Sequence, residues 1–298
     1  MRLNNVTQHE RMEKSSRGVV AVGRLSIGVN RTTNAEPAPS PDGSALAAAV
    51  GAWLVGADAA VCAVIGSDFP EWMILEIARA GIDTSRIQPL APSDATLGPE
   101  LDPLPEQLTA LSPSWAVHVC GLPLGRQREI VRSLKQRVAC ITLDIDVAGA
   151  AAPDLNQLLE LAAECDAFLP GQKEVAQLWP GEPPRAVLRA MADAGVPAAV
   201  IRLGAGGSLG IRGGDIISMP AFPVMSEGGM GVGNVYAGAF AAIFAGDHDL
   251  RRAMAWAAAA ASVVVESNVL LGKVSEFARK RVEARARILD GKIKALAD

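Results

Sequence analysis

Short apolar runs alternate with longer segments of mixed character along most of the chain. Residues 59–65, 116–120 and 139–144 have the length and composition of buried strands. Residues 44–54 and 126–136 are predicted to form helices between these strands. Strands that alternate with helices favour a parallel sheet with helices packed on its faces. The pattern therefore predicts a three-layer α/β fold with a doubly wound, mostly parallel central sheet.

The two ends of the chain add further elements. A first strand is predicted over residues 19–27, and a strand, a glycine turn and a β-hairpin over residues 200–224. Residues 235–245 and 253–265 are almost continuously apolar, which predicts helices buried on most sides. Residues 273–298 predict a charged helix. Its apolar positions, expected to pack on the domain, are Val274, Phe277, Val282, Ile288, Leu289 and Ile293.

Composition and charge limit the classes of function. The chain has 298 residues, 50% of them hydrophobic, so it can build a sizeable core. A net charge of −4 without a dense basic patch gives no support for nucleic-acid binding. Residues 1–17 predict a flexible polar tail without a secretory signal, and residues 18–298 a single domain. The longest apolar run is too short to span a membrane, and a cytoplasmic protein is expected.

The cysteines and histidines predict neither a disulfide framework nor a zinc site. The cysteines are widely spaced and lack a C-x-x-C pair, which is typical of buried reduced thiols. The histidines are far apart in the sequence, so a histidine-based metal site or catalytic triad is not expected. These residues are Cys62, Cys120, Cys140 and Cys165, and His9, His118 and His248.

A glycine-rich stretch at residues 225–240 leads directly into an apolar segment. Its glycines stand at positions 228, 229, 231 and 233. Glycine lets another group approach the backbone closely, and the first turn of a helix has unbonded N–H groups that suit a phosphate. Two interpretations stay open at this point: an anion cradle, or a plain glycine-rich turn capped by Asn234.

The sequence context resembles the C-terminal signature of the ribokinase-like (PfkB) carbohydrate kinases, most clearly from Ile201 to Ser267. In that family the loop reads D-T-x-G-A-G-D, and here residues 228–234 read GGMGVGN. The resemblance implies the ribokinase fold and a site for ATP and Mg²⁺. The positions that it assigns to ATP binding are Gly231, Val232 and Gly233 in this loop, and Gly204 and Gly207 in an L-G-x-x-G turn.

Asn234 occupies the position of the family's catalytic aspartate. In these kinases the aspartate takes the proton from the substrate hydroxyl. An amide cannot act as that base near neutral pH, and positioned acid–base catalysis is worth roughly 10² to 10⁴-fold in rate. The anion cradle can therefore persist without the normal chemistry.

The family's sugar-binding positions are also substituted. Gly28 stands where the family has a substrate-binding aspartate. The family's G-G-x-x-x-N motif matches residues 42–47, where only Gly43 is kept; Asp42 replaces the first glycine and Ala47 the asparagine. A sugar or a nucleoside remains the expected small-molecule ligand, although its usual contacts are lost.

A P-N-x-x-E motif, which organises the waters of the magnesium ion in the family, matches residues 170–174. Glu174 is retained, whereas Gly171 replaces the asparagine. The helix dipole alone favours a glutamate in a first helical turn, so Glu174 indicates Mg²⁺ only weakly and indirectly. Asp144 and Asp146 follow a predicted strand, and one of the two is expected to face the ligand site.

Two proline-rich segments, about residues 29–42 and 88–113, correspond to the β-sheet lid of the family. Proline removes ladder donors, so a reduced or absent lid is expected. Such a lid would leave a sheet edge exposed, which predicts a homodimer or a protein partner over it.

These observations support three hypotheses. The first is a ribokinase-like pseudokinase that binds ligands or scaffolds a partner without normal phosphotransfer. The second is an active ATP-dependent kinase for an unusual sugar or nucleoside, with Asp144, Asp146 or Glu227 as the base. The third takes glycines 229, 231 and 233 as a dinucleotide fingerprint, but that motif belongs in the first βα turn of a chain.

Overall fold

The structure is a computed structural model that describes residues 18–30, 38–90, 105–108, 111–146, 153–225, 231–266 and 270–296. The tail predicted at residues 1–17 lies outside these ranges. So do residues 226–230, which include Glu227 and the first three residues of the glycine-rich loop, and parts of both predicted lid segments.

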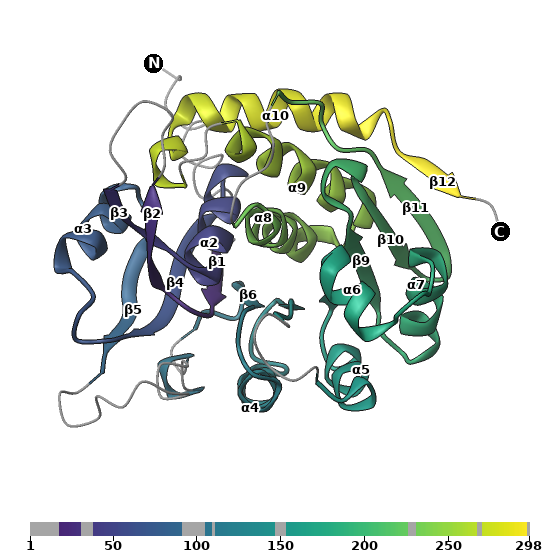
Figure 1. The fold of residues 1–298 in the computed structure, drawn as a ribbon, viewed down its shortest axis with the longest axis horizontal. Helices are drawn as coiled ribbons and strands as arrows, with labels where there is room; N and C mark the ends of the chain where they lie inside the picture. Colours follow the sequence, from purple (N-terminus) through teal and green to yellow (C-terminus); the bar gives the residue numbers. More distant parts are fainter. Residues whose placement is uncertain are drawn as a thin grey trace, which may run out of the picture.

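A ten-stranded sheet forms the centre of the fold, in the order β12-β11-β10-β9-β8-β7-β6-β1-β4-β5 (Figure 1). The strands from β9 to β5 in this order pair in parallel, whereas β10, β11 and β12 pair antiparallel. The mostly parallel sheet predicted from the sequence is confirmed. The strands are β1 (Gly18–Val22), β4 (Asp58–Ile65), β5 (Asp83–Pro89), β6 (Ala116–Val119), β7 (Cys140–Leu143), β8 (Ala167–Phe168), β9 (Ala198–Arg202), β10 (Ser208–Arg212), β11 (Asp215–Met219) and β12 (Lys294–Leu296).

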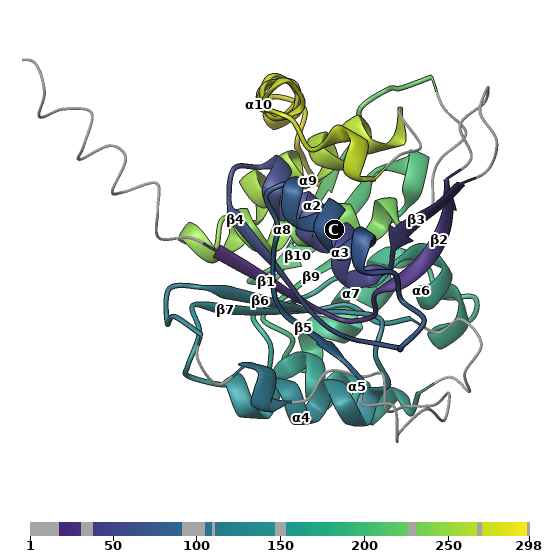
Figure 2. The ribbon, with the colours of Figure 1, turned by 90° about the vertical axis from the view of Figure 1, so that its left-hand side faces the viewer.

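Helices cover both faces of this sheet, which gives the three predicted layers (Figure 2). Successive residues of β1 point into different cores: Val19 and Ala21 into one, Val20 and Val22 into the other. Helices of the first face are α2 (Ser44–Leu54), α3 (Glu71–Arg79), α8 (Val232–Asp247), α9 (Leu250–Val265) and α10 (Glu276–Asp290). Helices of the second face are α4 (Leu124–Leu134), α5 (Leu155–Ala163), α6 (Gln172–Leu178) and α7 (Pro184–Asp193). Short 3₁₀ helices are η3 (Pro105–Leu108), η4 (Gly204–Gly206) and η5 (Leu271–Lys273).

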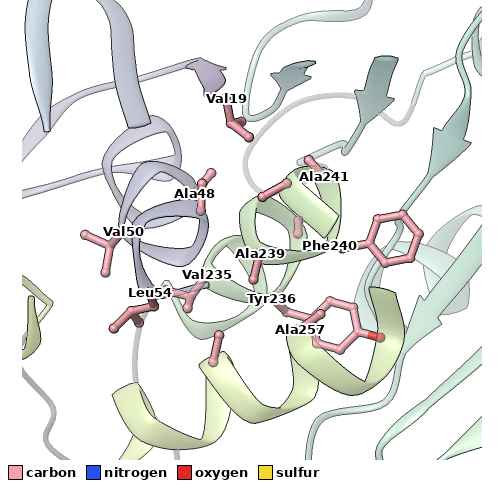
Figure 3. Close-up of a cluster of buried hydrophobic side chains, with 14 of the residues drawn as sticks. Val19, Ala48, Val50, Leu54, Val235, Tyr236, Ala239, Phe240, Ala241 and Ala257 are labelled. Atoms are coloured by element: carbon pink, nitrogen blue, oxygen red, sulfur yellow. The ribbon is translucent and has the colours of Figure 1, made fainter. Parts of the chain in front are cut away.

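The side chains between α2, α8 and α9 are mostly small, and the helices approach closely (Figure 3). A Cβ atom at Gly238 would lie 1.9 Å from the carbonyl oxygen of Ala48, and one at Gly51 would lie 2.0 Å from that of Val235. Both neighbours are backbone atoms, which cannot rotate away. The two glycines therefore set the distance between α2 and α8, the two helices whose N-termini lie at the candidate site.

Gly238→Ala should destabilise the protein by about 1–3 kcal/mol or more, because over-packing forces the two backbones apart. The control is Gly125→Ala in α4, where a Cβ atom meets nothing within 4 Å. There the change should be neutral or stabilise the helix by up to about 1 kcal/mol. Urea unfolding of both variants measures the difference, and equal stabilities would contradict the close helix contact.

The described part of the first predicted lid segment forms a small sheet with the residues that precede it. β2 (Ser26–Asn30) and β3 (Ala38–Asp42) form a separate two-stranded antiparallel sheet. The first strand predicted over residues 19–27 is present but shorter, because β1 ends at Val22 and a second strand, β2, begins at Ser26. A strand in the proline-rich segment was not expected. Proline is tolerated there because β3 pairs on one side only, so its other edge needs no donors.

The described part of residues 88–113 adds no strand to the lid. β5 continues to Pro89 in the main sheet, and residues 105–108 form η3.

The C-terminal segment differs from its prediction. α10 ends at Asp290, and β12 then extends the main sheet beside β11. Val282 and Leu289 are buried as expected, but Phe277 is 72% exposed and Ile288 is 50% exposed. Both lie on the outer side of a helix that packs along one stripe only, so their predicted packing is wrong.

Other predictions from the sequence are confirmed. The hairpin of β10 and β11 is present, and all four cysteines are free and buried. Within the described residues no helix is long and apolar enough to cross a membrane.

Candidate functional site

The order of the strands reverses between β1 and β6, at the point where ligands bind in doubly wound sheets. Ser44, at the start of α2, lies against the carboxyl ends of both strands. Its Oγ accepts a hydrogen bond from the Arg24 N–H at 3.2 Å. Cβ atoms at Gly23 and Gly121 would lie 2.8 and 2.4 Å from the same oxygen. The N-terminus of α2 is thus held directly over the switch point.

The glycine-rich loop enters α8 through a left-handed residue. Gly231 has φ 78°, a conformation that favours glycine, and α8 begins at Val232 without a side-chain cap among the described residues. The backbone N–H groups of Val232, Gly233 and Asn234 are in the first turn, where a helix offers unbonded donors and a partial positive charge. These features fit the phosphate groups of ATP, which this turn would bind through backbone amides.

Arg202 ends β9 and links the sheet to this first turn. Its Nη1 donates to the carbonyl oxygen of Gly233 at 2.5 Å, and its Nη2 donates to Asp144 Oδ1 at 2.7 Å. Its Nε is buried and has no hydrogen-bond partner among the described residues. The guanidinium therefore connects the first turn of α8 to the buried carboxylate of Asp144.

Asp144 is the buried partner of this guanidinium. It is 2% exposed, and burial raises the pKa of its carboxyl to about 6; Arg202 opposes the shift and Glu174 adds to it. Asp146 is exposed. β7 ends at Leu143, so strand alternation does not set the directions of these two acids. Whether either of them faces a ligand stays a prediction.

His118 lies in β6, the strand beside β7, whose end leads to Asp144. Its Nδ1 is 2.8 Å from Thr142 Oγ1 in β7. Burial, with a further contribution from Arg202, lowers the pKa of the imidazole to about 3, so the ring is neutral at physiological pH. The sequence indicated no role for this histidine, and the structure places it in the sheet core.

The motif at residues 170–174 lies close to Arg202. Gly171 pairs with Arg202 in an isolated bridge and precedes α6. A Cβ atom at Gly171 would lie 2.3 Å from Glu174 Oε2 and 3.7 Å from Arg202 Nη2. The Glu174 carboxylate therefore fills the space of a side chain at position 171. Its role toward Mg²⁺ stays a prediction, and no group of three metal-ligating side chains occurs within the described residues.

The three predicted substrate positions lie around the start of α2. Gly43 precedes α2 with φ 122°. Ala47 faces the α8 turn, because its Cβ would be 3.3 Å from a Cβ atom at Gly231. Gly28 lies in β2 beside Asp42 of β3. The structure thus brings the predicted substrate motif and the predicted phosphate turn together, and their binding roles stay predictions.

Gly204 and Gly207 form the turn that follows Arg202. Gly204 has φ 59° and Gly207 has φ 86°, and the N–H of Leu203 donates to the Gly207 carbonyl oxygen at 2.8 Å. A Cβ atom at Gly207 would lie 2.1 Å from the Met219 carbonyl oxygen, so the close approach requires glycine. α8 follows the β10–β11 hairpin rather than the first strand, which does not fit a dinucleotide fingerprint.

Arg202 is a site residue that was not found from the sequence. The sequence feature that could have indicated Arg202 is its position as the single basic residue at the end of an otherwise apolar strand, residues 198–202. A charged side chain in that position requires a buried partner, and Asp144 is that partner.

Comparison with known proteins gives the same picture as the fold. The chain is 23% identical to a cytidine kinase of Thermococcus kodakarensis over 246 residues, which span 75% of this chain and 87% of that protein. The structure is similar to aminoimidazole riboside kinase from Salmonella enterica, with a TM-score of 0.74 and 17% identity over 90% of this chain and 98% of that one. It is also similar to Arabidopsis thaliana ribokinase complexed with ribose and ATP, with a TM-score of 0.70 and 18% identity over 92% of this chain and 99% of that one.

These structural similarities establish the fold, and a family model establishes the relationship. The description of that model is pfkB family carbohydrate kinase, and it matches residues 90–270, more than half of the chain. The chain therefore belongs to the pfkB family of carbohydrate kinases.

Proposed function

We propose that the protein binds ATP and a small sugar or nucleoside, and that it transfers the phosphoryl group slowly or not at all. The observation that carries this proposal is Asn234 in the first turn of α8. The amide cannot take a proton from a substrate hydroxyl. The protein would then act as a ligand-binding or scaffolding member of its family, a pseudokinase.

Nucleotide binding is supported by the geometry of the α8 turn. Gly231 keeps its left-handed conformation, and no side chain of the described residues caps the helix in place of a ligand. Arg202 donates to the carbonyl of Gly233 and so holds this turn in place. The Arabidopsis thaliana ribokinase, which has the same fold, is complexed with ATP in its structure. The Mg²⁺ ion would neutralise phosphate charge, with Glu174 acting through water.

No described residue is well placed to replace the base, which supports impaired transfer. Asp144 is buried and already accepts a hydrogen bond from Arg202. A carboxylate held in this way is poorly placed to receive a proton from a ligand. Asp146 is exposed beyond the end of β7, and Glu227 lies outside the described residues.

A second candidate function is an active ATP-dependent kinase that phosphorylates a hydroxyl of a sugar or nucleoside. The relative from Thermococcus kodakarensis is named a cytidine kinase, which favours this alternative. Phosphoryl transfer depends largely on positioning and charge, so a site without its usual base can retain some activity. A cytoplasmic location, a single domain over residues 18–298 and a homodimer or partner at the reduced lid are further parts of the proposal.

Calorimetric titration with Mg-ATP and with ADP tests nucleotide binding. We expect micromolar binding in the parent protein and at least about tenfold weaker binding in Gly231→Ala, because the added Cβ strains the left-handed residue that opens α8.

The matched control is Gly214→Ala in the β10–β11 turn. Gly214 also has a positive φ, 91°, and lies in a hairpin outside the candidate site. The Gly214→Ala variant should be less stable than the parent protein but should bind ATP with the same affinity. A parent protein that binds neither nucleotide, or equal weakening in both variants, would contradict the proposed nucleotide site.

A further inference from the structure

The Asp42 side chain fills the space that a side chain at position 28 of the lid would need. A Cβ atom at Gly28 would lie 2.8 Å from Asp42 Cβ and 2.9 Å from Asp42 Oδ2. Two side chains cannot fit there together, so the glycine at position 28 is what allows the carboxylate at position 42. The glycine at position 28 and the aspartate at position 42 are therefore linked, because one makes room for the other.

This shared space lies on the face of the β2–β3 sheet opposite to Ile27 and Val29. Ile27 and Val29, the neighbours of Gly28 in β2, are 44% and 53% exposed on the other face. Gly28 and Asp42 are both half-buried. Alternate residues of a strand point to opposite faces, so the Asp42 carboxylate lies on the side away from these exposed apolar residues.

One oxygen of Asp42 has a local role and the other does not. Oδ1 accepts the Gly43 N–H at 2.7 Å, which fixes the side chain at the entrance to α2. Oδ2 has no hydrogen bond or ion pair with any residue that the structure describes. A carboxylate has about four lone-pair positions, so most of its accepting capacity remains for a ligand.

Asp42 also stands at a suitable place relative to the phosphate turn. It lies two residues before the start of α2, and Ala47 in that helix faces Gly231 at the start of α8. The first turn of α2 therefore separates the carboxylate from the amides of α8. A small molecule bound across this turn would have one end at Asp42 and another at Gly231.

We propose that Asp42 selects the ligand by accepting hydrogen bonds from two adjacent hydroxyl groups. The ligand class is a compound with a vicinal diol, such as the furanose of a sugar or nucleoside. The assignment rests on the proposed function, which places the ligand at this edge of the sheet. It moves the hydroxyl-binding carboxylate from position 28 to position 42, on the neighbouring strand.

The test is titration of the full-length protein with cytidine, ribose and fructose, each with Mg-ATP present. We expect at least one of these diols to bind, and Asp42→Asn to weaken it by roughly 10- to 100-fold, the loss expected for hydrogen bonds to a charged group. Asparagine keeps an oxygen for the Gly43 N–H, so the fold should persist, and a thermal melt checks this. Asp58→Asn, an exposed acid at the start of β4, is the matched control and should leave the affinity unchanged.

The exchange variant Gly28→Asp/Asp42→Gly tests the shared space directly. It should recover binding to within about tenfold of the parent protein, whereas Asp42→Gly alone should not. Equal affinity of Asp42→Asn and the parent would overturn the assignment. So would a parent that binds Mg-ATP but none of the three diols, or a folded exchange variant that binds no better than Asp42→Gly. If the parent protein does not bind Mg-ATP, the proposed nucleotide site is contradicted instead.

Discussion

Replacing Arg202 by methionine should lower the free energy of unfolding by about 3–5 kcal/mol at neutral pH, the usual cost of removing one partner of a buried ion pair. Asp144 would keep its burial and lose the guanidinium that donates to it at 2.7 Å. The first turn of α8 would also lose the contact between Arg202 and the Gly233 carbonyl oxygen. Urea unfolding of the variant and the parent protein measures the difference.

The loss of unfolding free energy in Arg202→Met should depend on pH, and the protonation of Asp144 determines the direction of that dependence. Its folded-state pKa is raised to about 6, mainly by burial, and Arg202 acts against that shift. Without Arg202 the pKa would rise further, so the folded variant takes up a proton more readily than the unfolded chain. Protonation removes the unpaired charge, so the variant should regain stability relative to the parent as the pH falls from the variant's higher pKa to about 6, and the difference should level off at lower pH.

The double variant Arg202→Met/Asp144→Leu separates the ion pair from packing. A buried pair replaced by apolar residues is often neutral or even stabilising, so most of the loss should be recovered and its pH dependence should disappear. A loss below about 1 kcal/mol in Arg202→Met that does not change between pH 5 and pH 8 would contradict the importance of this pair.

The fold was predictable where the pattern is local and long. Apolar runs such as residues 59–65 become buried strands because both faces of a parallel sheet are covered. The apolar segments after residue 231 become α8 and α9 because they pack on several neighbours. β12 was not predictable, since a three-residue strand acquires its structure from its neighbour β11 rather than from its own sequence.

The candidate site was predictable only in part, because its contacts join residues that are distant in sequence. The glycines of the α8 turn form a local motif, and the sequence located them. Asp144 and Arg202 are 58 residues apart. The sequence indicated Asp144 as a possible ligand-facing acid and gave Arg202 no role. Tertiary structure alone shows that they neutralise each other beneath the turn.

The structure also changes the interpretation of two substitutions in the family motifs. In the sequence, Gly28 and Gly171 each look like the loss of one functional side chain. In the structure, a neighbouring carboxylate occupies each vacated space: Asp42 at Gly28, and Glu174 at Gly171. The departures at Gly28 and Gly171 are thus local rearrangements of polar groups. Asn234 has no such replacement among the contacts that the structure describes, so it remains the departure with the greatest consequence for activity.

Asn234→Asp should raise the rate of phosphoryl transfer by roughly 10² to 10⁴-fold, because it supplies a positioned base for the substrate hydroxyl. The side chains have almost the same size, so the first turn of α8 should keep its geometry. Arg202 lies one residue away, at the carbonyl of Gly233, and its charge would favour the ionised form of the new carboxyl. Release of ADP, with a diol that binds in the titrations as acceptor, measures the rate.

The matched control is Asn234→Ser, which removes the amide without adding a carboxylate and should stay as slow as the parent protein. Mg-ATP affinity should change little in either variant, because the phosphates are held by backbone amides of α8 rather than by this side chain. A parent protein that already turns over as fast as Asn234→Asp would mean that another group accepts the proton. The chain would then be an active kinase, and the base would have to be sought at Asp146 or at Glu227.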